Sequence, residues 1–197
     1  DFSFPQDLKT RIAEKIKTKT FHILVNNTGG PASGEIVNAT EEQFHSAFEH
    51  HLICNHILTT LLLPGMKKEN YGRIINIIST SVKIPLKGLG VSNTIRAAVA
   101  SWSKTMANEL GEFGITVNNV LPGGTNTDRL NEILKSKSVK TGKSVAEIET
   151  EMLLEIPMKR FGLPIEVANA VAFLSSPSAS YITGINLPVD GGRTGSL

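Results

Sequence analysis

Two side chains that suit chemistry lie four residues apart in the segment Ser92-Asn93-Thr94-Ile95-Arg96, where a long helical pattern begins. Residues four apart in an α-helix share one face, so the Ser92 hydroxyl and the Arg96 guanidinium lie one turn from each other. Such a pair suits a catalytic or ligand-binding role. A second interpretation stays open, in which Ser92 is only the N-cap of its helix and Arg96 is a surface or subunit-interface cation.

Small and polar residues also follow each of the strand-like segments, which cover residues 21–25, 73–78, 115–120 and 185–189. The residues that follow them are Asn26-Asn27-Thr28-Gly29, Ser79-Thr80-Ser81, Pro122-Gly123-Gly124-Thr125 and Asp190-Gly191-Gly192. Three of these turns let a ligand approach the backbone, and the one at Ser79 offers hydroxyls. Because ligands bind beyond the carboxyl ends of parallel strands, we expect the turns to form one crevice.

Helical patterns separate these strand-like segments, at about residues 3–18, 40–64, 92–111, 127–137, 144–154 and 164–174. Strand and helix alternate, with crossovers long enough for parallel strands. We therefore predict the α/β class, with a doubly wound parallel sheet in a single domain. The continuous apolar run at 21–25 predicts a strand buried on both faces.

Capping signals set some of the helix boundaries. Ser3 with Gln6 predicts one capping box, and Thr40-Glu41-Glu42-Gln43 predicts a second. The helix that begins at this second box is predicted to stop near Pro64-Gly65. The polar stretch 135–143 is the predicted mobile loop.

The composition is that of an ordinary globular domain, with 40% hydrophobic and 19% charged residues in a chain of 197. A net charge of +2 argues against a nucleic-acid or membrane surface, and no apolar run approaches membrane-spanning length. Basic residues are frequent between Lys9 and Lys19, but the acidic Glu14 lies among them, so we interpret this segment as a solvated helix face. The single cysteine, Cys54, is predicted to be a buried thiol, and the lack of a disulfide fits the cytoplasm.

Four histidines crowd one predicted helix, at positions 45, 50, 51 and 56. No two of them are three or four residues apart, so they do not share a helical face at metal-ligand spacing. We therefore predict no metal site, and His51 is most simply a polar side chain that lines the crevice.

Taken in order, these segments resemble the short-chain dehydrogenase/reductase family, and most closely its 3-oxoacyl-carrier-protein reductase-like members. Asn26-Asn27-Thr28-Gly29 is similar to the family's N-N-A-G, and Pro122-Gly123 with Thr127 is similar to its P-G-x-x-x-T. Arg160-Phe161-Gly162-Leu163-Pro164 and the segment 181–192 also match. The resemblance covers essentially the whole chain.

The resemblance implies a Rossmann-type NAD(P)-dependent oxidoreductase that acts on a small-molecule ketone (3-oxoacyl-like) or secondary alcohol and assembles as a homotetramer or homodimer. The cofactor-binding residues that it implies are Asp1, Asn26, Gly29, Arg96, Pro122, Gly123, Thr125 and Thr127. The choice between NADP and NAD stays open, because it is read from residues after the family's second strand.

The family's catalytic tetrad is altered in this chain. Its Y-x-x-x-K aligns with Ser92 and Arg96, its Ser aligns with Ser79, and its Asn aligns with His51, thirteen residues before Pro64. Ser79 alone is unchanged. The resemblance implies that Ser79 polarises the carbonyl, that Arg96 holds the nicotinamide ribose, and that Ser92 or His51 relays a proton.

The altered tetrad predicts reduction by a non-standard proton donor. The family's Tyr phenol, with a reference pKa of about 10, is acidified by the nearby Lys, whereas a Ser hydroxyl is shorter and far less acidic. His51, which we expect to titrate near neutrality, offers a proton through water. Two alternatives remain: a catalytically silent nucleotide-binding or scaffold protein, and a dehydration or isomerisation on the same fold.

The family's opening βαβαβ half, with its Gly-rich loop, has no counterpart in this sequence. Asp1 aligns with the Asp that ends the family's third strand. We therefore expect these residues to be the C-terminal two-thirds of a longer chain, in which further strands cover the apolar edge at 21–25.

Overall fold

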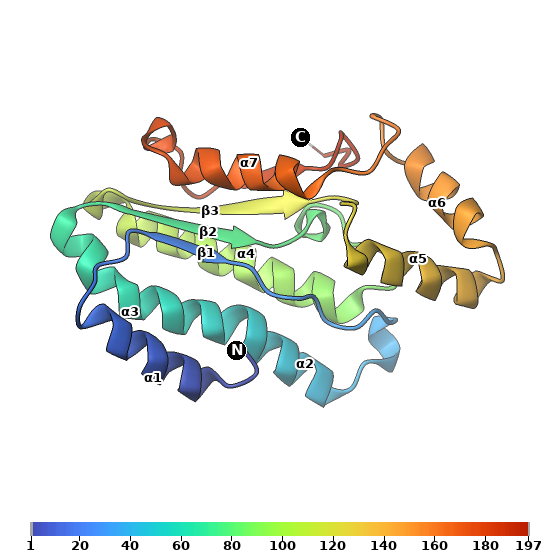
Figure 1. Cartoon of the computed structure of the whole chain (residues 1–197). Helices are drawn as coiled ribbons and strands as arrows, with labels where there is room; N and C mark the ends of the chain where they lie inside the picture. Colours follow the sequence, from blue (N-terminus) through green and yellow to red (C-terminus); the bar gives the residue numbers. More distant parts are fainter. Residues whose placement is uncertain (1, 197) are drawn as a thin grey trace.

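The computed structural model describes residues 2–196 and shows a four-stranded parallel sheet with helices on both faces (Figure 1). The strands are β1 (Ile23–Asn26), β2 (Gly72–Ile77), β3 (Ile115–Pro122) and β4 (Asn186–Val189), and they lie in the order β1-β2-β3-β4. Each neighbouring pair is parallel. The predicted doubly wound α/β fold is confirmed.

Helices α1 (Pro5–Ile16), α3 (Cys54–Glu69) and α4 (Gly90–Leu110) lie on one face of the sheet, and α7 (Pro164–Ser175) lies on the other (Figure 1). Helix α2 (Glu41–Phe48) precedes α3. Helices α5 (Asp128–Thr141) and α6 (Val145–Leu154) lie beyond the carboxyl end of β3 (Figure 1). The strand ends therefore face a region that is bordered by α5, α6 and the loops.

A row of asparagines fixes the register of the strands. Asn26, Asn76, Asn119 and Asn186 stand opposite one another on β1 to β4. Asn26 Nδ2 donates to Asn76 Oδ1 at 2.8 Å, Asn76 Nδ2 to Asn119 Oδ1 at 3.1 Å, and Asn119 Nδ2 to Asn186 Oδ1 at 2.8 Å. Ser103 of α4 joins this row, because its hydroxyl donates to Asn119 Oδ1 at 2.8 Å. A one-residue slip of any strand would break the row.

The sheet divides the core into layers. On the α3 and α4 side, the buried residues Met66, Ile74 and Val117 pack together, and Cys54 is also fully buried there, as predicted. The layer under α7 contains the buried residues Ile75, Val120, Leu174 and Ala179.

The prediction that the first strand is buried on both faces is wrong for the described part of the chain. The exposed fractions of Ile23 and Val25 are 48% and 43%, whereas Leu24 on the other face is buried. Helix α7 packs over β2, β3 and β4, and it leaves this face of β1 largely open. β1 pairs with β2 alone, so it forms an edge of the described sheet.

Several helix boundaries differ from the predictions. The capping box at Thr40 is confirmed, but α1 begins at Pro5 with Phe4 rather than Ser3 at its N-cap. The helix expected to stop near Pro64 continues to Glu69. A proline inside a helix costs about 3 kcal/mol, and the buried side chains of Leu62 and Met66 on either side of it offset that cost.

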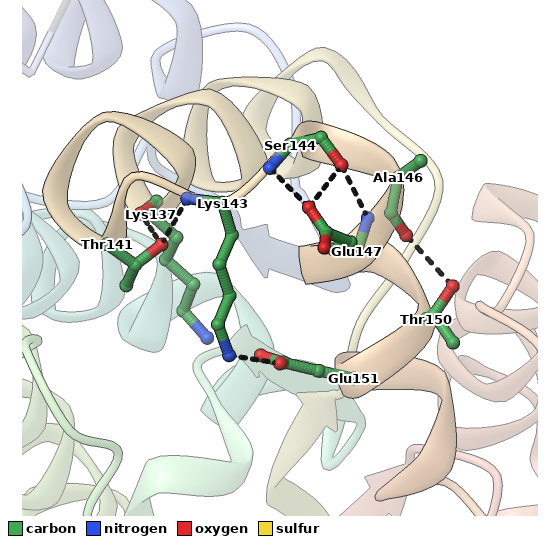
Figure 2. A network of polar contacts seen from close by, with 8 residues as sticks. All are labelled: Lys137, Thr141, Lys143, Ser144, Ala146, Glu147, Thr150 and Glu151. Atoms are coloured by element: carbon green, nitrogen blue, oxygen red, sulfur yellow. Dashed lines mark hydrogen bonds and ion pairs between the residues drawn. The ribbon is translucent and has the colours of Figure 1, made fainter.

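The stretch predicted as a mobile loop, 135–143, is helical as far as Thr141. Leu130 and Leu134 of α5 are buried against Ile148 of α6, so packing between the helices anchors the first half of α5, from which the helix continues. Figure 2 shows how the short connection is held: Glu147 and Ser144 form a capping box at the start of α6, and Lys143 contacts Glu151. Helices α5 and α6 therefore form one braced hairpin.

Candidate active site

Ser79 lies directly beyond the carboxyl end of β2, where a 3₁₀ turn over Thr80–Val82 begins. Its side-chain oxygen accepts a hydrogen bond from the backbone N–H of Ser81 at 3.1 Å. That bond fixes the side chain and uses its oxygen as an acceptor, which leaves the O–H to be donated to a ligand. Ser79 is partly exposed, so a ligand in the crevice can reach it.

Arg96 is a buried cation, not a surface one. Its exposed fraction is 7%, and its Nη1 donates to the backbone carbonyl of Ile77 at 2.7 Å. Burial lowers the pKa of the guanidinium to about 10, so it stays charged at neutral pH. Its Nε is buried without a hydrogen-bond partner among the described residues. A buried N–H without a hydrogen-bond partner lowers stability unless a ligand or a water molecule accepts its hydrogen bond.

Ser92 lies in the first turn of α4, which begins at Gly90 with Leu89 as the N-cap residue, so its interpretation as the N-cap is wrong. The neighbouring residue, Asn93, closes the loop before the helix. Asn93 Nδ2 donates to the carbonyl of Leu86 at 2.9 Å, and Asn93 Oδ1 accepts from the N–H of Leu86 at 3.4 Å. Sequence reasoning missed this residue, which sets the path of the loop between Ser79 and Ser92.

His51 lies in a π-helical turn, Glu49–Ile53, that interrupts the helix between α2 and α3. Such turns are frequent at functional sites. The exposed fraction of His51 is 3%, and its Nδ1 is hydrogen-bonded to the hydroxyl of Thr28. Burial, with the nearby charge of Arg96, lowers the pKa of His51 to about 3. The expectation that His51 titrates near neutrality is therefore wrong, and its imidazole is neutral at pH 7.

The structure brings the turn after β1 next to the buried cation. A side chain added at Gly29 would meet no atom within 4 Å, and one added at Gly30 would meet only the guanidinium ends of Arg96 and Arg129, at 3.9 and 4.0 Å. Arg129, which sequence reasoning missed, also donates to the carbonyl of Pro31 at 2.8 Å. Arg129 is also paired with Glu132, through Nη1 at 3.1 Å, whereas Arg96 has no carboxylate partner among the described residues. Open backbone beside the Arg96 guanidinium suits a ligand that is rich in hydroxyls or negative charge.

The remaining predicted cofactor residues lie at the end of β3. A side chain at Gly123 would lie 2.6 Å from Asp190 Cβ, so the tight packing of β3 against the turn after β4 requires glycine there. The Thr125 hydroxyl donates to the carbonyl of Gly123 at 3.3 Å, and the Thr127 hydroxyl donates to the carbonyl of Thr125 at 3.2 Å. These bonds brace the turn from Pro122 to α5. Asp1 lies outside the described residues.

Two cavities flank this constellation. One has a volume of about 290 Å³ and lies between the turn at Gly29 to Ala32 and the side chains of α2, with His50 and His51 in its wall. The other, of about 370 Å³, adjoins the 3₁₀ turn that follows Ser79. Its lining residues are Thr80, Ile84, Leu86, Glu155, Arg193 and Thr194. Sequence reasoning missed Glu155 and Arg193, although Arg193 directly follows the ligand-approach turn at Asp190-Gly191-Gly192.

Two further observations bear on the site and its surroundings. Within residues 2–196, no group of three or more His, Cys, Asp and Glu side chains is arranged to hold a metal ion. No helix in the same range is long enough and apolar enough to cross a membrane.

Comparison with known proteins identifies the family. The family model described as enoyl-(acyl carrier protein) reductase matches residues 3–194. The 3-oxoacyl-(acyl-carrier-protein) reductase FabG of Vibrio cholerae is 37% identical over 170 residues, which are 86% of this chain and 65% of that protein. The chain belongs to the short-chain dehydrogenase/reductase family.

Further similarities support this assignment. The NADPH-dependent reductase BacG of Bacillus subtilis is 31% identical over 98% of this chain and 75% of its own length. The crystal structure of L-sorbose reductase from Gluconobacter frateurii, in complex with NADPH and L-sorbose, matches with a TM-score of 0.90 and 30% identity. That match covers the whole of this chain and 76% of the other. The chain thus spans roughly two thirds to three quarters of the length of these relatives.

Proposed function

We propose that this chain carries the catalytic part of an NAD(P)-dependent oxidoreductase that reduces a ketone, or oxidises the matching secondary alcohol, without a tyrosine acid. The observation that carries the proposal is the placement of Arg96. The guanidinium of Arg96, which is buried and charged at neutral pH, is anchored on Ile77, two residues before Ser79, and it lies beside the open backbone at Gly29 and Gly30. The relatives that use NADPH support a nicotinamide cofactor.

The residues present fit such a cofactor. The Nη2 end of Arg96, which lies 3.9 Å from a Cβ placed at Gly30, would offer a donor to ribose hydroxyls, and Gly29 leaves room for the sugar. Pro122, Gly123, Thr125 and Thr127 form the braced turn that would border the nicotinamide and the pyrophosphate. When bound, the reduced nicotinamide supplies a hydride to the carbonyl carbon.

The chain's own residues handle the oxygen and the proton. Ser79 donates a hydrogen bond to the carbonyl oxygen, which stabilises the negative charge that develops there as the carbon is reduced. The alkoxide then takes a proton that the Ser92 hydroxyl passes on from water, and the ketone becomes a secondary alcohol. Neutral His51 is a relay in this scheme, not the source of the proton, because its pKa is about 3.

The test measures oxidation of NADPH and of NADH by the full chain with a panel of β-ketoacyl thioesters and diketones. We expect slow turnover, and we expect Ser79→Ala to lower kcat/KM by about 10²-fold, as loss of an oxyanion donor does. Ser101→Ala, an exposed serine of α4, is the matched control. If Ser79→Ala reduced ketones as fast as the parent chain, the assignment of Ser79 would be wrong.

A second candidate function is nucleotide binding without turnover. It is favoured by one observation: at neutral pH neither Ser92 nor His51 is an acid comparable to a phenol beside a cation. The sign of this function is a rise in melting temperature, or a change in Trp102 fluorescence, on addition of cofactor with no turnover of any ketone.

The relatives' family also leads us to propose a homotetramer or homodimer, to be tested by light scattering, and a cytoplasmic location. The location rests on the lone, buried thiol of Cys54. A monomer at all concentrations would contradict the assembly.

A further inference from the structure

The cavity of about 370 Å³ beside the Ser79 turn is lined by two separate parts of the chain. Thr80, Ile84 and Leu86, from the segment between β2 and α4, supply one hydroxyl and two apolar side chains. Glu155, Arg193 and Thr194 supply a charged pair and a second hydroxyl. A cavity with apolar side chains and one cation suits a small molecule that carries an apolar part and a negative group.

Arg193 is held in place before any ligand arrives. It follows a turn in which both carboxylate oxygens of Asp190 accept backbone N–H groups, from Gly192 at 3.0 Å and from Thr194 at 2.8 Å. The carbonyl of Gly191 accepts the N–H of Met158 at 3.2 Å, which ties the turn to the chain after α6. A cation on a braced turn loses little freedom on binding a ligand.

The pairing of Arg193 with Glu155 is one-sided. Arg193 Nε and Nη2 both donate to a single oxygen, Glu155 Oε2, at 3.1 and 2.5 Å. Among the described residues no hydrogen bond involves Arg193 Nη1 or Glu155 Oε1. The Glu155 side chain is 56% exposed, and that of Arg193 is 25% exposed. A ligand carboxylate with better geometry can therefore displace Glu155 from the guanidinium, because a partly exposed ion pair contributes little to stability.

We propose that Arg193 is a specificity residue that binds the carboxylate of a small oxo acid, with Glu155 as the internal group that this carboxylate displaces. A planar guanidinium fork matches a carboxylate in two parallel hydrogen bonds. Ile84 and Leu86 pack against the carbon chain, and Ser79, which precedes the turn that lines the cavity, donates a hydrogen bond to the carbonyl oxygen. This inference rests on the proposed ketone reduction for its substrate class.

The binding test uses pyruvate, acetoacetate and levulinate, together with their methyl esters, so that the spacing between carbonyl and carboxylate varies and the negative charge is present or absent. Isothermal titration measures each compound against the full chain with NADP⁺ present. We expect at least one oxo acid to bind about tenfold or more tightly than its ester. Equal affinities for every acid and ester pair, or no binding of any compound, would overturn the proposal.

Variants identify the group responsible. Arg193→Gln is expected to abolish the preference for the acid and to leave the ester affinity unchanged, and Arg193→Lys to keep part of the preference. Glu155→Gln is expected to tighten binding of the acid several-fold, since the competing carboxylate is gone, with no effect on the ester. Arg11→Gln, which removes an arginine paired with Asp7 on α1, is the matched control. Equal losses for acid and ester in Arg193→Gln would contradict the assignment.

Turnover with NADPH separates this proposal from the function on which it rests. If esters and acids are reduced at equal rates and Arg193→Gln changes neither rate, ketone reduction stands and the role of Arg193 is wrong. If the acids bind in an Arg193-dependent way but no carbonyl compound is reduced, the binding site stands and the reduction is wrong.

Discussion

The Nη1 atom of Arg96 donates a hydrogen bond to the carbonyl oxygen of Ile77 at 2.7 Å, and Ile77 is the last residue of β2. This bond ties the first turns of α4 to the strand end that also positions Ser79. The cation is therefore fixed relative to the Ser79 hydroxyl by the backbone itself. A lysine at this position has three donors on a flexible stem, whereas Arg96 holds one carbonyl and still presents other N–H groups.

Arg96→Lys is expected to weaken cofactor binding by about tenfold, because the ammonium cannot hold Ile77 and reach a ribose with the same geometry. The charge is retained, so we expect the fold to survive. Titration of NADPH against Trp102 fluorescence measures the Kd, and circular dichroism checks the fold. Arg11→Lys on α1 should leave the Kd unchanged. An unaltered Kd in Arg96→Lys would show that the guanidinium does not touch the cofactor.

Ser92→Tyr is expected to raise the rate of ketone reduction, most strongly in the double variant Ser92→Tyr/Arg96→Lys. A phenol reaches further than a serine hydroxyl, and a neighbouring cation makes it a stronger acid. General acid catalysis contributes about 10²–10⁴-fold, so a gain in kcat of about 10²-fold is reasonable for the pair. NADPH oxidation at saturating ketone measures it.

The control for this gain is Ser101→Tyr, at an exposed position of the same helix. It should not change kcat. If the double variant reduced ketones no faster than the parent chain when NADPH and ketone were both saturating, the missing phenol would not be what limits the reaction.

His51 predicts a pH dependence of stability. Its pKa is about 3 in the folded chain and near 6.5 in an unfolded one, so between these values the unfolded state binds one proton more. The free energy of unfolding therefore falls as the pH drops from about 6.5 toward 3, and this group contributes about 1.4 kcal/mol per pH unit.

His51→Gln is expected to remove that contribution, so that the unfolding free energy depends less steeply on pH in this window. Urea unfolding at pH 7, 6, 5 and 4 measures the slope for the parent chain and the variant. His45→Gln replaces an exposed histidine of α2 and is the matched control. Identical slopes for His51→Gln and the parent chain would mean that His51 titrates normally in the folded state.

Apolar runs and turn residues were sufficient to predict the α/β class, the four strands of the sheet and the turns at their carboxyl ends. Capping chemistry is local, so the box at Thr40 was also predictable. The helix end predicted at Pro64 was wrong because the proline signal is local, whereas the burial of Leu62 and Met66 on either side of it depends on the packed structure. The prediction of a loop at 135–143 was wrong for the same reason, since the helix there continues from Leu130 and Leu134, which are buried against α6.

The chemistry of the site was less predictable than the fold. The identity of His51 gives its pKa in water, but its protonation in the chain depends on burial and on Arg96, which are properties of the packed structure. Ser92 and Arg96 were correctly expected to share a helix, whereas the anchor of Arg96 on Ile77 lies nineteen residues away in the chain. Arg193 and Glu155 meet across thirty-eight residues, and no local pattern indicates that pairing.

The asparagine row provides the last prediction. Asn76 is fully buried, and it accepts from Asn26, donates to Asn119 and donates to the Ser103 hydroxyl at 2.9 Å. Asn76→Ala would leave several buried polar atoms without partners, each at a cost of about 1–3 kcal/mol, so we expect a loss of about 3 kcal/mol in the free energy of unfolding. Urea unfolding at pH 7 measures it.

Asn76→Asp tests whether the donors of Asn76 matter as well as its shape. A carboxylate is almost isosteric with the amide but cannot donate to Asn119 or Ser103 when ionised, and it adds a buried charge. It should therefore destabilise the chain at least as much as alanine does. Asn131→Ala, at an exposed position of α5, should change the unfolding free energy by less than about 0.5 kcal/mol. If Asn76→Ala were as mild as Asn131→Ala, the row would not be what fixes the register of β1, β2 and β3.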